Sequence, residues 1–387
     1  MRREWLSRDP ENAQVAQRAE FTRDPTPAAT HFTRNHYPTP SIDAEEWTLS
    51  VTGLVDRSAD VPLADLQRTF RTETVTTTIG CAGNGRSGFR PRAAGHQWGV
   101  GALSTARWTG VPVGEVLHSA GACLDDDCWV AAIGDDAPEG ESVFARSLPM
   151  RKLLEDCLLA YGMNGHPLPA EHGAPVRLIV PGWYGTNSVK WLSRLHVMET
   201  MLCGPEWEEY THWQQEKYRL VPQGEQPTER ETIDAFDLGD QFADPSIRHP
   251  FMYGMLVNSL IVSPGPDESL APERGDSVTI QGVAWAGDND ISAVEVSTDG
   301  GETWHSATLL GDDEQPCWRQ FGFEWTPRSG THTLVSRATD DRGRTQPAAI
   351  SDPDERLLTI ANRKFPWNKR GYASNAYGPV ATTVTAE

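Results

Sequence analysis

The chain has 387 residues, of which 54 are acidic and 34 basic, so its formal net charge is −20. A surface this acidic argues against binding to nucleic acids or to anionic membranes, because both recruit clustered Lys and Arg side chains. The length favours two domains, and no apolar run in the sequence is long enough to cross a membrane. The N-terminus lacks the apolar stretch of a secretory signal, so we expect a cytoplasmic protein.

The first two thirds of the chain mix short strands with short helices. Residues 1–30 are polar and contain Arg-Asp-Pro twice, and we expect them to form an N-terminal arm over the surface. In the domain expected at 31–240, the pattern predicts strands at 47–51, 129–133, 159–165 and 176–180, and helices at 61–66, 111–117 and 149–158. Because no repeated strand–helix unit and no glycine-rich dinucleotide motif is present, this region is predicted to have an α+β fold.

The last third of the chain has a different pattern. A polar, acidic bridge near 223–250 leads into short apolar runs at 277–282, 293–297, 319–325 and 331–338. Gly- and Asp-rich turns separate these runs, which is typical of strands joined by hairpins. Residues 250–387 are therefore predicted to form an all-β sandwich.

One stretch, residues 76–86, combines a β-branched run with a cysteine and a small-residue turn. It reads Thr-Thr-Thr-Ile-Gly-Cys-Ala-Gly-Asn-Gly-Arg, and the run before Cys81 favours a strand. The glycines allow the backbone to turn around the sulfur, and Arg86 places a permanent cation beside a would-be thiolate. A cysteine at a strand end is more often a small buried residue, but this setting indicates a metal ligand.

This stretch resembles the molybdenum-ligand segment of the sulfite oxidase family, whose enzymes hold molybdenum through a molybdopterin dithiolene and one protein cysteine. Further segments match in the same order, at 31–36, 101–108, 171–177 with 188–191, and 212–218. The resemblance covers nearly the whole chain. It implies a molybdopterin-binding domain of sulfite oxidase-like fold, followed by an immunoglobulin-like dimerisation domain, and it implies Cys81 as the metal ligand.

The resemblance also implies which residues bind the pterin and its phosphate. The matched positions are Phe32, Asn35, His36, Asp136, His172, Arg177, Ser188 and Lys190. Arg177 suits bidentate contact with an oxyanion, whereas Lys190 acts as a point charge. The alignment of the acidic loop allows Asp135 in place of Asp136. Taken alone, His172 and Arg177 would be read as ordinary surface residues.

A second set of matched residues is expected to bind substrate. Arg34, Arg86 and Arg370 match three family arginines that line the substrate pocket, and Trp98 matches its aromatic wall. Several guanidinium groups suit a compact anion with many oxygens. Tyr218 matches the family's active-site tyrosine, whose phenol can donate a hydrogen bond and move a proton. Relatives commonly carry two arginines after Cys-Ala-Gly-Asn, and here the first position is a glycine.

These matches imply an enzyme that oxidises sulfite to sulfate by oxygen-atom transfer. The sequence shows no haem-binding or flavin domain, so electrons are expected to pass to a separate acceptor. A nitrate or sulfoxide reductase with the same centre is the alternative enzyme. A non-enzymatic interaction protein with a degenerate cofactor pocket is a third possibility, against which the intact Cys81, Tyr218 and Lys190 speak. The C-terminal sandwich predicts a two-fold homodimer.

Overall fold

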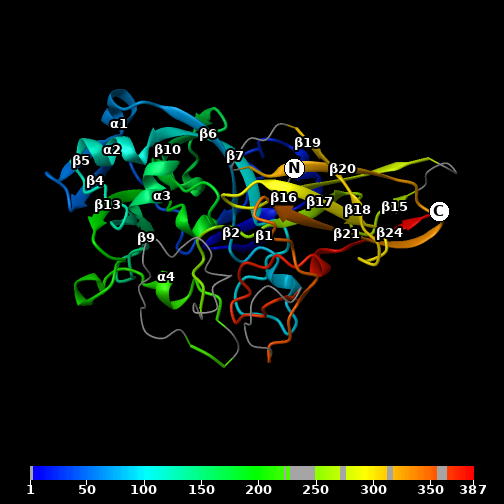
Figure 1. The fold of residues 1–387 in the computed structure, drawn as a ribbon. Helices are drawn as coiled ribbons and strands as arrows, with labels where there is room; N and C mark the ends of the chain where they lie inside the picture. Colours follow the sequence, from blue (N-terminus) through cyan, green and yellow to red (C-terminus); the bar gives the residue numbers. More distant parts are fainter. Residues whose placement is uncertain (1–2, 222–223, 227–248, 271–275, 312–316, 355–363) are drawn as a thin grey trace.

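The computed structural model describes residues 3–221, 224–226, 249–270, 276–311, 317–354 and 364–387. Figure 1 shows a mixed α and β half, coloured blue to green, beside a half built of strands, coloured yellow to orange. The chain ends at the far tip of the strand-rich half. The predicted fold class, an α+β domain followed by an all-β sandwich, is confirmed. The bridge expected at 223–250 lies almost wholly outside the described residues.

Two five-stranded sheets build the first half and enclose its core. One has the order β11 (His166–Pro167), β10 (Leu158–Met163), β7 (Leu103–Pro112) and β6 (Glu73–Gly80), with β12 (Arg177–Ile179) paired to β10. The other has the order β5 (Ala59–Pro62), β4 (Thr48–Gly53), β13 (Leu192–Met198), β8 (Trp129–Gly134) and β9 (Ala145–Pro149). Apolar side chains from these strands are fully buried in one cluster, among them Leu49, Val111, Val130 and Leu195. Burial of this apolar surface is the main stabilising term for the half.

Three helices of this half begin directly after a strand that ends in proline. α1 (Leu63–Thr69), α2 (Val113–Ser119) and α3 (Met150–Glu155) follow Pro62, Pro112 and Pro149. Proline has no backbone N–H to donate to a neighbouring strand, and its fixed φ suits the start of a helix. The helices expected at 61–66 and 111–117 are therefore present, beginning two residues later than predicted.

The helix predicted over 149–158 is too long. It ends at Glu155, and Leu158 already pairs with Pro112 of β7 and with Ile179 of β12. Pairing on both sides satisfies the backbone groups of β10 in the sheet, and this tertiary constraint overrides the local helix pattern. Beyond these elements lie α4 (Trp213–Glu216) and short 3-10 helices at Arg18–Thr22, Arg86–Gly88, Ala170–His172, Gly185–Asn187, Pro205–Trp207 and Gly378–Val380.

The first residues do not form the surface arm that was expected. β1 (Arg3–Arg8) and β2 (Glu11–Val15) form a hairpin, and β2 also pairs with β3 (Thr33–Arg34). Asn12 and Ala13 at its centre are fully buried. The polar composition was misleading because Asn12 is satisfied inside the protein: its amide donates to Ser7 Oγ at 2.9 Å, and its oxygen accepts from the Asn35 N–H at 3.2 Å.

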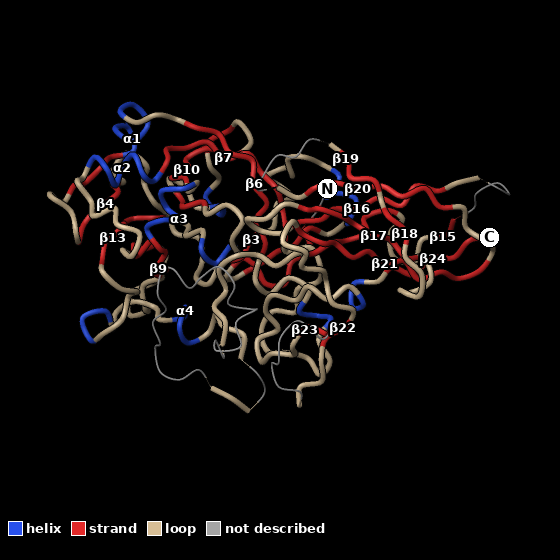
Figure 2. The backbone as a smooth tube through the Cα atoms, in the orientation of Figure 1, coloured by secondary structure: helices blue, strands red, loops and turns tan. Residues whose placement is uncertain are grey.

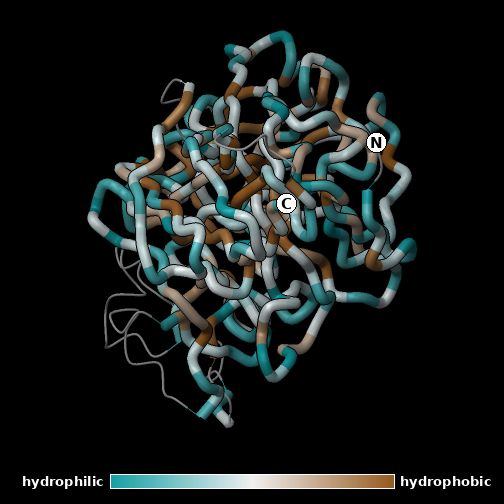
Figure 3. The backbone as a smooth tube through the Cα atoms, turned by 90° about the vertical axis from the view of Figure 1, so that its right-hand side faces the viewer, coloured by the Kyte–Doolittle hydropathy of each residue, from teal (hydrophilic) through white to brown (hydrophobic). Residues whose placement is uncertain are grey.

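The second half is a two-sheet sandwich. One sheet has the order β14 (Asn258–Ser263), β16 (Val278–Trp285), β20 (Arg319–Trp325) and β19 (Thr308–Leu310), and the other β15 (Ser269–Leu270), β24 (Thr382–Ala386), β21 (Gly330–Asp340), β17 (Ile291–Ser297) and β18 (His305–Ser306). All four strands predicted for this region are present. Apolar residues from both sheets, among them Ile280, Val296 and Leu334, form its core. Viewed from this end, apolar segments gather inside and polar segments lie outside (Figure 3).

The C-terminal part of the sandwich domain returns to the first half before the last strand. After β22 (Ala349–Ile350) and β23 (Lys364–Phe365), mostly irregular chain lies beneath the junction of the halves (Figure 2). Trp367 packs in one buried cluster with Phe89 and Leu103 of the first half. The N–H of Ala373 donates to the carbonyl of Ala82 at 2.7 Å. The second domain therefore contributes backbone to the neighbourhood of Cys81.

Candidate functional site

A cavity of about 400 Å³ lies where this C-terminal segment meets the first half. Its size is that of a small-molecule or cofactor site. Every site residue predicted from the sequence lines it: Phe32, Arg34, Asn35, His36, Cys81, Arg86, Trp98, Asp136, His172, Arg177, Ser188, Lys190, Tyr218 and Arg370. Asp136 is 9% exposed and faces the cavity, while Asp135 is exposed to solvent, so Asp136 is the one of the two that can reach a ligand there.

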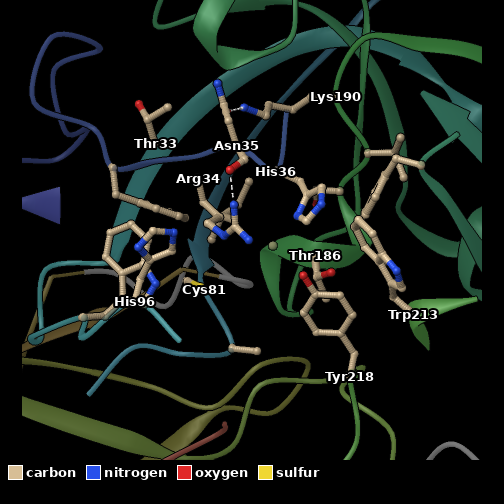
Figure 4. Close-up of a pocket in the computed structure, with 18 of the residues that line it drawn as sticks. Thr33, Arg34, Asn35, His36, Cys81, His96, Thr186, Lys190, Trp213 and Tyr218 are labelled. Carbon is tan, nitrogen blue, oxygen red and sulfur yellow. Dashed lines mark hydrogen bonds between the residues drawn. The ribbon is translucent and has the colours of Figure 1, made fainter. Parts of the chain in front are cut away.

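Cys81 lies at the end of β6, where the sheet gives way to a tight turn. Its N–H still donates to the carbonyl of Ala102 at 2.8 Å, which continues the strand pairing. The N–H of Gly83 donates to the Cys81 sulfur at 3.4 Å, and Gly85 has a φ of +80°. Figure 4 shows the sulfur at the wall of the pocket. The turn thus presents a sulfur with an N–H directed at it, an arrangement that favours a thiolate ligand.

Arg86 lines the cavity but also ties its walls together. The side chain is 5% exposed; its Nε donates to the carbonyl of Arg370 at 2.6 Å and its Nη1 to that of His96 at 2.7 Å. A Cβ on Gly83 would lie 2.5 Å from Arg86 Nη2, so a larger residue there would displace the guanidinium. Arg86 therefore fixes the position of Arg370 in addition to lending its own charge.

Cations crowd the end of the cavity near Cys81. Arg34 donates to the carbonyl of Asn35 and to Asn12 Oδ1, the latter at 3.2 Å. Lys217 lies 4.1 Å from the ring centroid of Trp213, and desolvation together with the charge of Arg370 lowers the pKa of Lys217. Such a cluster favours a compact anion with several oxygens.

Aromatic residues from separate segments of the chain also line this end. Trp98 is 1% exposed and forms a closed wall beside His96. The phenol of Tyr218 points into the pocket toward Thr186 in Figure 4. Tyr218 is positioned by α4, because its N–H donates to the carbonyl of Trp213, the first residue of that helix.

The opposite end of the cavity is built around two cations, of which Arg177 is buried and Lys190 half-buried. Arg177, at the start of β12, donates to the carbonyls of His172 at 2.8 Å and Ser188 at 3.1 Å. Lys190 donates to the carbonyl of Glu171 at 2.9 Å and to Asn35 Oδ1, a bond drawn dashed in Figure 4. Burial lowers the pKa of Arg177 to about 9, and burial plus the charge of Arg177 lowers that of Lys190.

Polar atoms left without partners show what kind of ligand this end would accept. In the described part of the chain, Arg177 Nε, His31 Nε2 and Asp136 Oδ1 are buried and make no hydrogen bond. Buried polar groups are normally satisfied, so such atoms indicate a ligand that supplies the missing partners. Two cations and a carboxylate suit a ligand with a phosphate and a polar, hydrogen-bonding heterocycle, which is the chemistry of molybdopterin.

Several residues that line the cavity were not predicted from the sequence. They include His31, His96, Thr186, Trp213, Lys217 and Tyr372. Lys217 directly precedes Tyr218 in a matched segment, and Tyr372 follows Arg370 by two positions, so sequence proximity was the available signal. His96 has no such signal, because its place depends on how residues 90–98 fold over Arg86.

Comparisons with known proteins show which family the chain is similar to. The family model described as the oxidoreductase molybdopterin binding domain matches residues 36–205, and the Mo-co oxidoreductase dimerisation domain matches 249–384. Human mitochondrial sulfite oxidase is 36% identical over 93% of this chain, and the chain spans 62% of that relative's length. Sulfite oxidase of Gallus gallus is 34% identical over 96% of this chain and 76% of the relative.

A solved structure and a more distant relative extend the comparison. The sulfane dehydrogenase SoxCD of Paracoccus pantotrophus is similar with a TM-score of 0.73 at 26% identity, covering 100% of this chain and 90% of that one. A nitrate reductase of Phaseolus vulgaris is 31% identical over 93% of this chain but 39% of its own length.

Fold, pocket and matched domains define a molybdopterin-dependent oxidoreductase architecture with a dimerisation domain. Within that class, the chain belongs to the sulfite oxidase family.

The ionisation of Asp136 gives a test of the cofactor end. Burial, opposed by the charge of Lys190, raises the pKa of Asp136 to about 6 from an ordinary value of 3.8. Above that pH the folded protein must bury a charge, whereas the unfolded chain ionises freely. Asp136→Asn should therefore stabilise the cofactor-free protein at pH 8 by up to about 3 kcal/mol. The gain should shrink toward zero as the pH falls from 6 to 4, measured by denaturant unfolding.

The exposed neighbour Asp135 supplies the control, because Asp135→Asn should give no comparable gain at any pH. A stabilisation by Asp136→Asn that is equal at pH 4 and pH 8 would contradict the ionisation argument. In the cofactor-loaded protein, Asp136→Asn should instead weaken retention of the pterin, since a ligand donor loses its acceptor.

Proposed function

We propose that this protein oxidises sulfite to sulfate with a molybdenum–molybdopterin cofactor and passes the electrons to a separate acceptor. The observation that carries the proposal is the single cysteine, Cys81, held at the end of a cavity that also presents Arg34, Arg86 and Arg370. Similarity to sulfite oxidases over most of the chain supports the same activity.

The residues of the pocket divide into two groups in this proposal. Cys81 gives a thiolate to the metal, since soft sulfur ligands suit such a redox centre. Arg177 and Lys190 hold the phosphate, while Asp136 and His172 hold the pterin, with Phe32, Asn35, His36 and Ser188 completing its walls. When bound, the cofactor supplies oxygen-atom transfer and takes up two electrons.

The remaining side chains act on the substrate. The sulfite anion would be bound and oriented by the charges of Arg34, Arg370 and Lys217. Trp98 would exclude water from one side of it. The phenol of Tyr218 would donate a hydrogen bond to a substrate oxygen and pass on a proton when water enters after sulfate leaves.

Reduction of nitrate or a sulfoxide by the same centre is less well supported. Nitrate reductases are among the relatives, but at lower identity than the sulfite oxidases of vertebrates. An interaction protein without activity does not account for the retained Cys81, Tyr218 and Lys190.

Three further expectations from the sequence stand as proposals. The chain acts without haem or flavin of its own, it works in the cytoplasm, and it forms a homodimer through the domain matched to the dimerisation family. Among the described helices, none is long and apolar enough to cross a membrane.

The direct test is a steady-state assay of purified, molybdenum-loaded protein with sulfite and an artificial electron acceptor. We expect turnover by the wild type and roughly one molybdenum per chain. Cys81→Ser should fold but hold molybdenum weakly or be inactive, because a hydroxyl is a much poorer donor to this metal than a thiolate. A wild type that reduces nitrate but leaves sulfite untouched would sink the proposal in favour of the reductase.

The homodimer is tested by light scattering of the purified protein. A two-fold dimer should persist at micromolar concentration, because domains of this kind present one self-complementary face. A stable monomer under the same conditions would rule this arrangement out.

Arg370 tests whether the second domain takes part in substrate binding. Arg370→Met nearly keeps the side-chain length but removes a charge-assisted donor, worth about 1.5–3 kcal/mol. The KM for sulfite should therefore rise roughly ten- to a hundredfold with molybdenum content unchanged. Arg370→Lys should rescue only partly, since a point charge does not reproduce the guanidinium fork.

The matched control is Lys369→Met. Lys369 is the adjacent residue, is exposed and does not line the cavity, so its loss should leave KM near the wild-type value. Small and equal effects of the two substitutions would mean that Arg370 does not meet the substrate.

A further inference from the structure

Tyr372 lies in the pocket beside the proposed catalytic tyrosine, although it comes from the other domain. Its side chain lines the cavity, and its ring stacks on that of Tyr218 with centroids 5.4 Å apart and planes 22° apart. The guanidinium carbon of Arg86 lies 5.1 Å from the centroid of the Tyr372 ring. The next residue, Ala373, donates its N–H to the carbonyl of Ala82 at 2.7 Å, which places Tyr372 at the Cys81 end of the cavity.

The backbone holds Tyr372 firmly in this place. Its N–H donates to Asn368 Oδ1 at 2.9 Å, and its carbonyl accepts from Asn368 Nδ2 at 3.1 Å. Gly371 and Ala373, on either side, both have a φ of +57°. For Ala373 this left-handed conformation carries a cost, which persists only where the surroundings impose it. Here the bond from its N–H to the carbonyl of Ala82 does so.

The rings are further fixed by a buried cation. Arg146 is 1% exposed, and its guanidinium carbon lies 5.2 Å from the ring centroid of Tyr218. Its Nη2 donates to Asn187 Oδ1 at 2.7 Å, while its Nε and Nη1 have no partner in the described part of the chain. A desolvated guanidinium over an aromatic face is attracted to the ring. Each of the two stacked rings therefore has a guanidinium group over it.

The hydroxyl of Tyr372 is the group that this arrangement leaves for a ligand. It makes no hydrogen bond with any described residue. Burial and the neighbouring Tyr218 raise the pKa of Tyr372, so the phenol stays protonated and can donate. Neighbouring cations would draw an anion to the same end of the cavity.

We propose that Tyr372 is a second substrate-contacting phenol, which donates a hydrogen bond to an oxygen of the bound oxyanion beside Tyr218. This inference rests on the proposed function, because it requires that a small sulfur oxyanion binds at the Cys81 end. Two phenols from different domains would then donate hydrogen bonds to different oxygens of one anion. Tyr372 would contribute to substrate affinity, whereas Tyr218 would also handle the proton.

The test is Tyr372→Phe in the molybdenum-loaded protein, with two readouts. The ring stack is kept, so the protein should fold and hold its cofactor. Loss of one neutral hydrogen bond should raise the KM for sulfite by about two- to tenfold with little change in kcat. The dissociation constant for sulfate, measured by titration calorimetry at matched molybdenum content, should rise by a similar factor. Tyr377→Phe is the control, because Tyr377 packs against Trp304 outside the cavity.

The outcomes separate this inference from the proposal on which it rests. Wild-type protein that binds sulfate and oxidises sulfite, together with a Tyr372→Phe variant equal to it in both constants, overturns the role of Tyr372 alone. A wild type that neither oxidises sulfite nor binds sulfate overturns the proposed function and this inference with it. A loss of affinity confined to Tyr372→Phe, and absent from Tyr377→Phe, supports it.

Discussion

The buried guanidinium of Arg86 is the contact on which the pocket depends. It donates to the carbonyls of His96 and Arg370, and so joins a loop of the first domain to the C-terminal segment of the second. Three glycines leave room for it, because a Cβ would approach its atoms to 2.5 Å at Gly83, 2.9 Å at Gly95 and 2.7 Å at Gly371. The turn after Cys81, the loop before Trp98 and the segment of Tyr372 therefore close around one side chain. Space for that side chain is a constraint on all three.

Charge at the opposite end of the pocket carries a cost that the protein offsets only in part. Arg177 and Lys190 donate to carbonyl and amide oxygens, and burial lowers the pKa of each cation. Carbonyls compensate a buried charge less well than a carboxylate or phosphate does. An anionic cofactor would supply that compensation, and by binding the folded state it would stabilise the fold as well. The charges that suit this end of the cavity to an anionic ligand therefore lower the stability of the protein without that ligand.

The local sequence pattern predicted many of the strands and turns, and the features that it missed share a physical cause. The strands at 129–133 and 319–325 follow from apolar runs between turns, and the Cys81 turn follows from small residues after a β-branched run. Arg146 could not be predicted, because its contacts with Asn187 and Tyr218 join residues far apart in sequence, as the Arg86–Arg370 bond does across 284 positions. The N-terminal hairpin and the early end of α3 were missed for the same reason. In both, pairing with a distant strand decides the structure.

The second domain also supports the cofactor end of the pocket, through contacts made by Asp288. Asp288, in the loop between β16 and β17, pairs with Lys152 at 2.8 Å and accepts from Trp183 Nε1 at 2.8 Å. A Cβ on Gly182 would lie 2.0 Å from Asp288 Oδ1, so the loop of Trp183 packs directly on this carboxylate. That loop continues into Ser188 and Lys190, which line the cofactor end, while the C-terminal segment brings Arg370 to the other end. Because the same domain matches a dimerisation family, association of two chains would act on a domain that holds both ends of the pocket in place. Formation of a dimer would in this way bear on the geometry of the pocket.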